Sequence, residues 1–237
     1  MDPILLSTIY GCVAGTIGTG LGGVISCFFK PSDDRLLAKL MGFSAGIMLA
    51  VVIFSMIPES LEMTGIGVTI VGLAIGAAFI AAAEKLLEKL QKGSRLKRVG
   101  ILLFTGIALH NLPEGLAIGA GLNAPADFGI KLALLIMLHD IPEGLAMAIP
   151  KRMEGKNPIL LTVLAGLPTA FGAGLGMLLG NISVGFIGGS IAFAGGAMLY
   201  LTLADLLPES ASVSGKKTML LSALVGLLAG AVFVFVL

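Results

Sequence analysis

The chain has 237 residues, of which 57% are apolar and 12% are charged, and its formal net charge is +1. Soluble domains contain about 25% charged residues, so this chain has too few charges to cover a water-exposed surface. The composition excludes a soluble domain and indicates an integral membrane protein. Its apolar stretches are continuous and roughly twice as long as the ten-residue alternating strands of membrane barrels, which predicts helices.

Stretches without charged residues predict the membrane-spanning helices in chain order. A helix needs about 20 residues to cross the hydrocarbon core. Several uncharged stretches are close to that length or longer, and two further apolar segments carry polar residues near their middles. The predicted spans are about 4–28, 40–58, 63–83, 99–122, 132–150, 158–179, 185–207 and 218–237. We therefore expect an all-α integral membrane protein with eight transmembrane helices in one polytopic domain, residues 1–237.

The basic residues predict the orientation of these spans. Every Lys and Arg except Lys131 falls in one of four alternate loops that lie on the same side of the membrane if there are eight spans. Cytoplasmic loops are enriched in Lys and Arg. We therefore place those four loops in the cytoplasm and both termini outside, in a multi-pass protein of the cell membrane.

Two outer segments of the chain resemble each other at an offset of 150 residues. The sequence AGIML at 45–49 corresponds to GGAML at 195–199, and Pro-Glu-Ser at 58–60 corresponds to Pro-Glu-Ser at 208–210. With eight spans, the two copies have opposite orientations. Inverted repeats are typical of transporters whose substrate site lies near the membrane midplane. The alternative is a coincidence among Gly, Met and Leu in a chain of biased composition.

The fourth and fifth predicted spans share a stronger repeat. HNLPEGLA at 110–117 corresponds to HDIPEGLA at 139–146, again in opposite orientation, and the two copies contain both His residues of the chain. On a helix, residues four apart lie on the same face. Each imidazole, His110 and His139, therefore shares a face with a carboxylate, Glu114 and Glu143. Asn111 and Asp140 border those faces.

The excess of buried negative charge favours a bound cation. No Lys or Arg lies in the predicted spans, whereas Glu114, Asp140 and Glu143 do. Ionisable residues inside a membrane are costly and mark ion or proton pathways. Two imidazoles with three carboxylates and an amide suit a first-row divalent metal such as Zn²⁺ or Fe²⁺, whereas Ca²⁺ and Mg²⁺ prefer all-oxygen sites. The alternative is a polar cluster with protonated carboxyls that braces a helix crossing.

The paired motifs resemble those of the ZIP (Zrt- and Irt-like) metal transporters, particularly their prokaryotic branch, and the resemblance covers essentially the whole chain. It implies eight helices with inverted repeats, helices 1–3 against 6–8 and helix 4 against 5. It also implies movement of divalent metal from outside into the cytoplasm. The family's transport-site ligands correspond here to His110, Asn111, Glu114, His139, Asp140 and Glu143. Met48 resembles a soft ligand of some relatives, although a single Met is also a common gap filler in a core.

One position departs from the family pattern. Many relatives carry a Glu in the sixth helix, within the pattern Ser-Gly-Leu-x-Glu, which ligates a second metal bridged by the two motif glutamates. The matching stretch here is Ala-Gly-Leu-Pro-Thr at 165–169. Thr169 cannot supply a carboxylate, so we expect the second metal to be held weakly or not at all.

Two function classes follow from these observations. The first is a transporter of divalent transition metals, with zinc ahead of iron, manganese and cadmium. The second is a zinc-dependent intramembrane hydrolase, in which the metal activates water. The chain has no H-E-x-x-H sequence, and its G-x-S-x-G sequence at 42–46 lies within a predicted membrane span instead of the strand-to-helix turn that a serine nucleophile elbow requires. We therefore favour the transporter and expect no enzymatic activity. The metal is then the transported substrate, with no prosthetic group. The expected partners are divalent metal ions and the lipid bilayer, without nucleic acid, and a homodimer is left open.

Overall fold

The computed structural model describes residues 2–28, 34–90, 108, 111–124, 127–153, 157–180 and 182–236, and the regular structure within these ranges is helical. The named elements are α1 (Pro3–Ser26), α2 (Asp34–Val51), η1 (Val52–Met56), α3 (Ile57–Leu90), α5 (Phe128–Met153), α6 (Ile159–Ala165), α7 (Leu167–Gly180), α8 (Val184–Leu201), η2 (Thr202–Leu206), α9 (Leu207–Ser214) and α10 (Lys216–Val236). Residues 111–121 form a further helix, and residues 99–107 of the fourth predicted span lie outside the described residues.

Several of these helices are long and apolar enough to cross a membrane. Among the described residues, five helical stretches meet that condition: Pro3–Ser26, Ala38–Leu86, Ile159–Gly180, Val184–Ser214 and Lys216–Val236. The α5 helix has 26 residues, or about 39 Å at 1.5 Å per residue, and carries the ionisable residues of the fifth predicted span. The chain is therefore an all-α, multi-pass membrane protein, as its composition predicts.

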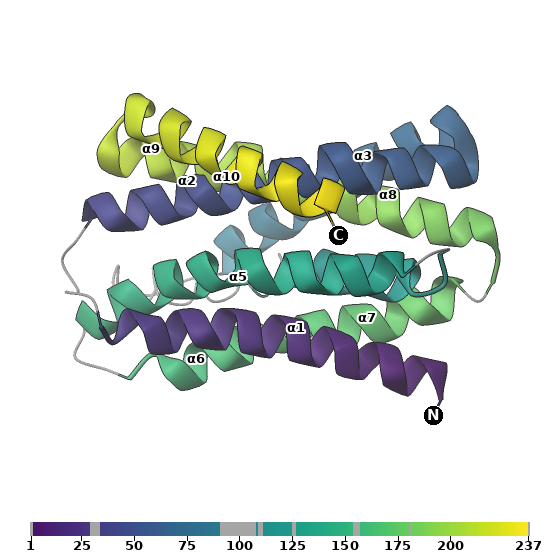
Figure 1. Cartoon of the computed structure of the whole chain (residues 1–237), viewed down its shortest axis with the longest axis horizontal. Coiled ribbons are helices and arrows are strands. Elements are labelled where there is room, and N and C mark those ends of the chain that lie inside the picture. Colours follow the sequence, from purple (N-terminus) through teal and green to yellow (C-terminus); the bar gives the residue numbers. More distant parts are fainter. Residues whose placement is uncertain are drawn as a thin grey trace.

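The helices form two groups, which appear as two layers in Figure 1. The first, which we call the site group, contains α1, the helix 111–121, α5, α6 and α7. The second, which we call the frame group, contains α2, η1, α3, α8, η2, α9 and α10. Within the site group α1 packs on α5, α6 and α7; within the frame group α3 packs on α8, and α2 packs on α10. The α2 helix also contacts α5, so this pair forms part of the boundary between the groups.

Glycine lets the helices within each group approach very closely. Gly18 of α1 lies against Asp140 of α5, where a Cβ atom at position 18 would be 2.6 Å from Cβ of Asp140. In the frame group, Gly76 of α3 meets the backbone of Phe193 on α8. Small residues at helix contacts allow backbones to pack closely in lipid. Throughout the part of the chain that the structure describes, the nearest neighbours of the glycines belong to the same group as the glycine itself.

The frame-group helices continue beyond the predicted ends of the second and seventh spans. Helix extends from η1 through residues 57–64 and from η2 through residues 207–214. Ile57, which precedes Pro58, donates its backbone N–H to the carbonyl of Val52, five residues back. Leu207, which precedes Pro208, donates in the same way to the carbonyl of Thr202. This wider π turn precedes Pro58 and Pro208, which cannot donate a backbone hydrogen bond. The helical geometry is first interrupted at glycines 65 and 215.

Positions 150 residues apart share further structural details. Gly65 has φ 74° and ψ 174°, and Gly215 has φ 85° and ψ 154°, a backbone region that glycine adopts without a Cβ clash. The hydroxyl of Ser60 donates to the carbonyl of Gly188 (2.9 Å), and that of Ser210 donates to the carbonyl of Ala38 (2.7 Å). Both the donors and the acceptors of these two bonds are therefore separated by the same offset.

The sixth predicted span is divided into α6 and α7 at Gly166. Pro168 has no N–H to donate to the carbonyl of Leu164, so a regular helix cannot continue through this point. The N–H of Thr169 bonds to the carbonyl of Gly166 (3.2 Å), three residues back, instead of to Ala165. The carbonyl of Ala165 is thereby left without its usual helical donor.

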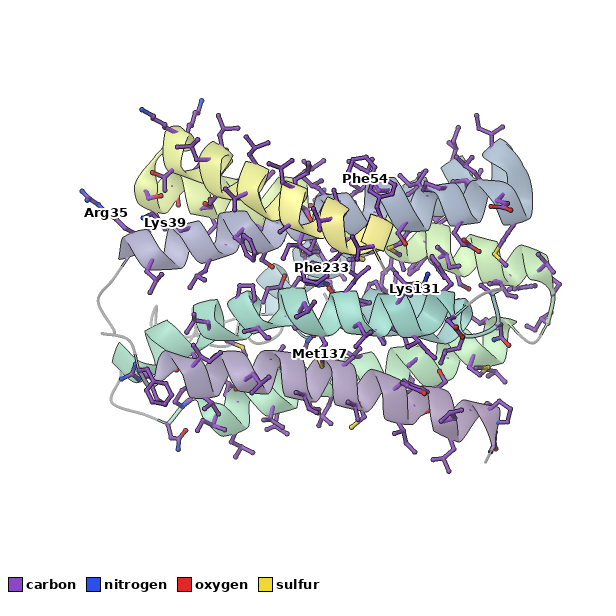
Figure 2. All side chains as sticks on the ribbon, viewed as in Figure 1. Arg35, Lys39, Phe54, Lys131, Met137 and Phe233 are labelled. Atoms are coloured by element: carbon purple, nitrogen blue, oxygen red, sulfur yellow. The ribbon has the colours of Figure 1, made fainter. Side chains whose placement is uncertain are left out.

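Within the described ranges, several basic residues lie at one end of the bundle. Figure 2 shows Arg35 and Lys39 at the end where α2 begins, and Lys131 toward the opposite end, near the start of α5. Lys216 and Lys217 open α10 at the end that also holds Arg35. These positions agree with the division of basic residues on which the predicted orientation depends.

Candidate metal centre

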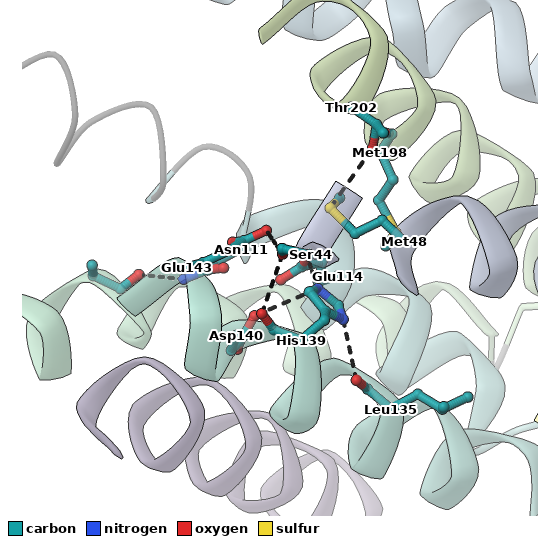
Figure 3. Close-up of polar contacts among 11 residues, drawn as sticks. Ser44, Met48, Asn111, Glu114, Leu135, His139, Asp140, Glu143, Met198 and Thr202 are labelled. Atoms are coloured by element: carbon teal, nitrogen blue, oxygen red, sulfur yellow. Dashed lines mark hydrogen bonds and ion pairs between the residues drawn. The ribbon is translucent and has the colours of Figure 1, made fainter. Parts of the chain in front are cut away.

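The paired motifs of the fourth and fifth predicted spans meet inside the site group (Figure 3). Asn111, Glu114, His139 and Asp140 have no exposed side-chain surface, and Glu143 is 4% exposed. The spacing of His139 and Glu143 places both side chains on one face of α5, as their four-residue separation predicts. His110 lies outside the described residues.

The closest contact of the centre joins the two motifs. His139 Nε2 lies 2.7 Å from Oε1 of Glu114, which projects from the helix 111–121. Asp140 Oδ1 lies 3.5 Å from the same His139 nitrogen. One ligand atom from each of Glu114, His139 and Asp140 can be chosen so that all three lie within 4.8 Å of one another. A single ion could therefore be reached by all three side chains.

The contact of His139 Nδ1 with a backbone carbonyl indicates which ring nitrogen carries a hydrogen. His139 Nδ1 lies 3.1 Å from the carbonyl oxygen of Leu135, which can only accept a hydrogen bond, so Nδ1 is the donor. A second hydrogen must then lie between His139 Nε2 and Oε1 of Glu114, because two lone pairs would repel at this distance. The pair is therefore either an imidazolium with a carboxylate or an imidazole with a carboxylic acid. Metal ligation requires deprotonated donor atoms, so an ion that uses both atoms must displace this hydrogen.

Several other buried oxygen atoms of the site group lack a hydrogen-bond partner among the described residues. The side-chain NH₂ of Asn111 donates to the carbonyl of Ala165 (2.7 Å), which the break between α6 and α7 leaves available. The oxygen of the Asn111 amide, both carboxylate oxygens of Asp140 and the Thr169 hydroxyl are buried and have no hydrogen-bond partner among the described residues. Buried polar atoms are normally satisfied, so such a set of oxygens suits a cation or ordered water.

Thr169 lies in the wall of the site group. Its side chain is fully buried near the start of α7. It packs between Gly15 of α1 and Gly115 of the helix 111–121, both of which would clash with Thr169 if they carried a Cβ atom. Thr169 therefore presents a hydroxyl, and not a carboxylate, in this wall.

The α2 helix contributes Met48 to the surroundings of the centre. Met48 is fully buried, and Thr202 Oγ1 of η2 lies 3.7 Å from its sulfur while donating to the carbonyl of Met198 at 2.7 Å. Figure 3 shows the Met48 side chain beside the group formed by Glu114 and His139. The structure thus places a thioether near the candidate centre, in contact with a hydroxyl of the frame group.

The sequence reasoning missed Ser44, one helical turn before Met48. Ser44 Oγ donates to Oε1 of Glu143 (3.0 Å) and lies 3.3 Å from the carbonyl oxygen of His139. The only available signal was its position: residues 44 and 48 lie on the same face of α2, so a face that presents Met48 to the centre also presents Ser44.

Comparisons with known proteins point to one family. The model of the family described as ZIP Zinc transporter matches residues 81–237. The zinc transporter ZupT of Corynebacterium efficiens is 34% identical over 241 residues, covering 89% of this chain and 89% of that protein. The ZupT proteins of Corynebacterium glutamicum and Chlorobium chlorochromatii are each 32% identical, covering 90% and 88% of this chain and 91% and 89% of their own lengths.

Proposed function

Because the chain belongs to the ZIP zinc transporter family, we propose that it carries divalent transition-metal cations from outside the cell into the cytoplasm, with zinc as the principal substrate. The relatives are named as transporters, which does not favour the hydrolase alternative. The protein is accordingly a transporter and not an enzyme. The metal is its cargo, and the cell membrane is its proposed location.

The observation that carries this proposal is the buried convergence of Glu114, His139 and Asp140. Two carboxylates and an imidazole within 4.8 Å of one another are costly in an apolar environment unless they share a proton or a cation. Nitrogen and oxygen donors together suit zinc, which binds His nitrogen and carboxylate oxygen. Iron, manganese and cadmium are the competing substrates that the same donor set admits.

We assign the ligands of the transported ion to the two motifs. The proposed set is His110, Asn111, Glu114, His139, Asp140 and Glu143, with Met48 as an additional soft ligand. Burial of the described members and the short contact between Glu114 and His139 support this assignment. Thr169 lacks the charge of a sixth-helix carboxylate, so we propose one tightly bound ion and a weak or unoccupied second position.

We further propose eight spans with inverted repeats, helices 1–3 against 6–8 and helix 4 against 5. The π turns before Pro58 and Pro208 and the left-handed glycines 65 and 215 support the outer repeat. The paired octapeptides support the central one. Both termini then lie outside the cell, an orientation supported by Arg35 and Lys39 at the end where α2 begins and by Lys131 toward the other end (Figure 2). Whether the transporter works as a homodimer is a separate question, answered by its mass in detergent.

Uptake into proteoliposomes tests the proposal directly. Purified protein is reconstituted, and entry of Zn²⁺ is followed with an internal zinc-sensitive dye while Fe²⁺, Mn²⁺ and Cd²⁺ compete from outside. We expect saturable zinc uptake that Glu143→Ala abolishes, because this carboxylate is a proposed ligand of the passing ion. Zinc flux no greater than in protein-free vesicles would refute the function. Normal flux in Glu143→Ala would instead support the alternative of a bracing polar cluster.

A further inference from the structure

Ser44 of α2 reaches from the frame group to the candidate ligands on α5. Its side chain is fully buried. Its hydroxyl donates to Oε1 of Glu143 at 3.0 Å, and the carbonyl oxygen of His139 lies 3.3 Å away. Both acceptors belong to the site group, so this hydroxyl connects the two groups at the candidate metal centre (Figure 3).

This arrangement differs from that of most hydroxyls in the helices. A serine or threonine within a helix commonly donates to the carbonyl three or four residues earlier. Thr8, Thr16 and Ser222 do so here, bonding to the carbonyls of Ile4, Cys12 and Thr218. The recorded hydrogen bonds of Ser44 go instead to α5, so they are contacts between helices.

The chemistry of a carboxylate permits Ser44 and a metal to act on Glu143 together. An ionised carboxylate has two oxygen atoms with about four lone-pair positions. One hydroxyl uses a single position and leaves the others for the ion. Ligating carboxylates are typically held by such outer hydrogen bonds, and loss of the partner typically lowers metal affinity or activity by about 10–100-fold.

We propose that Ser44 is a positioning residue that orients the Glu143 carboxylate toward the transported ion from across the boundary between the two helix groups. This inference rests on the transport function proposed above, because it assigns Glu143 as a ligand. The bond forms only where α2 and α5 are in this register. A slide of about 2 Å across the bond lengthens the 3.0 Å contact beyond hydrogen-bond distance. When the two groups slide past each other, the hydrogen bond from Ser44 to Glu143 therefore breaks, and the affinity of the site for the ion falls.

The test separates metal affinity from transport rate. Zinc binding to purified protein is measured by calorimetry, and initial zinc uptake into proteoliposomes is measured over a range of zinc concentrations. We expect Ser44→Ala to raise Kd and KM by about 10–100-fold while the maximal rate stays within about twofold. Ser44→Thr, which keeps the hydroxyl, should restore the affinity. Ser44→Gly, which also lacks the hydroxyl, replaces Ser44→Ala if that variant does not reconstitute.

Ser210→Ala is the matched control. Ser210 is also fully buried and donates a hydrogen bond of 2.7 Å to α2, at the carbonyl of Ala38, but it has no contact with the candidate ligands in the described structure. It should bind zinc like the wild type. A double-mutant cycle completes the test: in a Glu143→Ala background, Ser44→Ala should change zinc affinity no further.

Three results would overturn the role of Ser44: wild-type affinity in Ser44→Ala, an equal loss in Ser210→Ala, or a further loss in the Glu143→Ala background. Failure of the wild type to transport zinc is a distinct result. It would refute the proposed function, while calorimetry would still show whether Ser44 supports metal binding at Glu143.

Discussion

Gly18→Ala tests how closely α1 holds the Asp140 turn of α5. A Cβ atom at position 18 would lie 2.6 Å from Cβ of Asp140, 2.7 Å from the carbonyl oxygen of Met137 and 3.2 Å from Asp140 Oδ2. Nonbonded carbon atoms prefer about 3.5–4.0 Å, so α1 and α5 must part locally by about 1 Å. The added methyl group therefore moves a proposed ligand without changing its chemistry.

The size of the effect follows from the geometry of metal sites. Ligand distances tolerate changes of about 0.2 Å, so a displacement of about 1 Å removes Asp140 from the ion or strains the remaining ligands. Overpacking of this kind typically costs about 1–3 kcal/mol. If the ion experiences about 1.4 kcal/mol of that cost, its affinity falls tenfold. We expect calorimetry on purified protein to show a zinc Kd at least about tenfold higher than that of the wild type.

Gly20→Ala is the control on the same helix. A Cβ atom there would meet only Cγ2 of Val163, at 3.0 Å, the far end of a side chain that can move. Both substitutions gain the same helix propensity, about 1 kcal/mol, so that term cancels in the comparison. Gly20→Ala should bind zinc as the wild type does. Equal zinc affinity in Gly18→Ala and Gly20→Ala would show that the contact between α1 and Asp140 does not shape the metal site.

The other predictions address the ligands, the second metal position and the orientation. Glu114→Ala should abolish zinc uptake into proteoliposomes, whereas Asn111→Ala should lower the rate less, because the amide supplies only a neutral oxygen. Equal rates in the two variants at equal protein would contradict these roles. Thr169→Glu should raise the number of tightly bound Cd²⁺ ions from one to two, counted by anomalous scattering, because it adds a charged oxygen to the wall of the site group. An unchanged count would remove Thr169 from that position. In a background without the native cysteines, a membrane-impermeant thiol reagent should label a Cys at Ile182, which is 60% exposed, in intact cells but not a Cys at Arg35. The reverse pattern would invert the proposed direction of transport.

The family, the all-helical class and the faces of the motif helices could be predicted from sequence because they depend on local patterns. Composition indicates the membrane, four-residue spacing places His139 and Glu143 on one face of α5, and the paired octapeptides carry the family resemblance, which the comparisons confirm. The contribution of α2 could not be predicted in the same way. Ser44 meets Glu143 only through the packing of two helices 99 residues apart in sequence, and no local pattern encodes that contact.

The ends of the helices were less predictable than their centres. Charged residues at 59 and 62 indicate where the apolar stretch ends, but a helix does not have to end with the hydrocarbon core. Its backbone hydrogen bonds remain satisfied in the headgroup layer, so helix continues to residue 64. The interruption at Gly65 depends on a single glycine in a chain with 34 of them. Composition alone cannot identify which glycine adopts a left-handed conformation.

The confinement of glycine contacts within each helix group has a consequence for where the activation barrier to transport lies. Close backbone contacts make each group resist internal deformation, and Glu114, His139, Asp140 and Glu143 all belong to one group. An ion held by these proposed ligands would therefore move with that group and would be separated from the proposed soft ligand Met48 of α2. The plane along which the groups meet is lined by larger side chains, including Met48 of α2 and Ile136 of α5 in the shared apolar core. Interdigitated surfaces of this kind tend to switch between discrete positions instead of deforming continuously. Substitutions along this plane, away from the ion, should therefore alter the speed of each transport cycle more than the selectivity among metals.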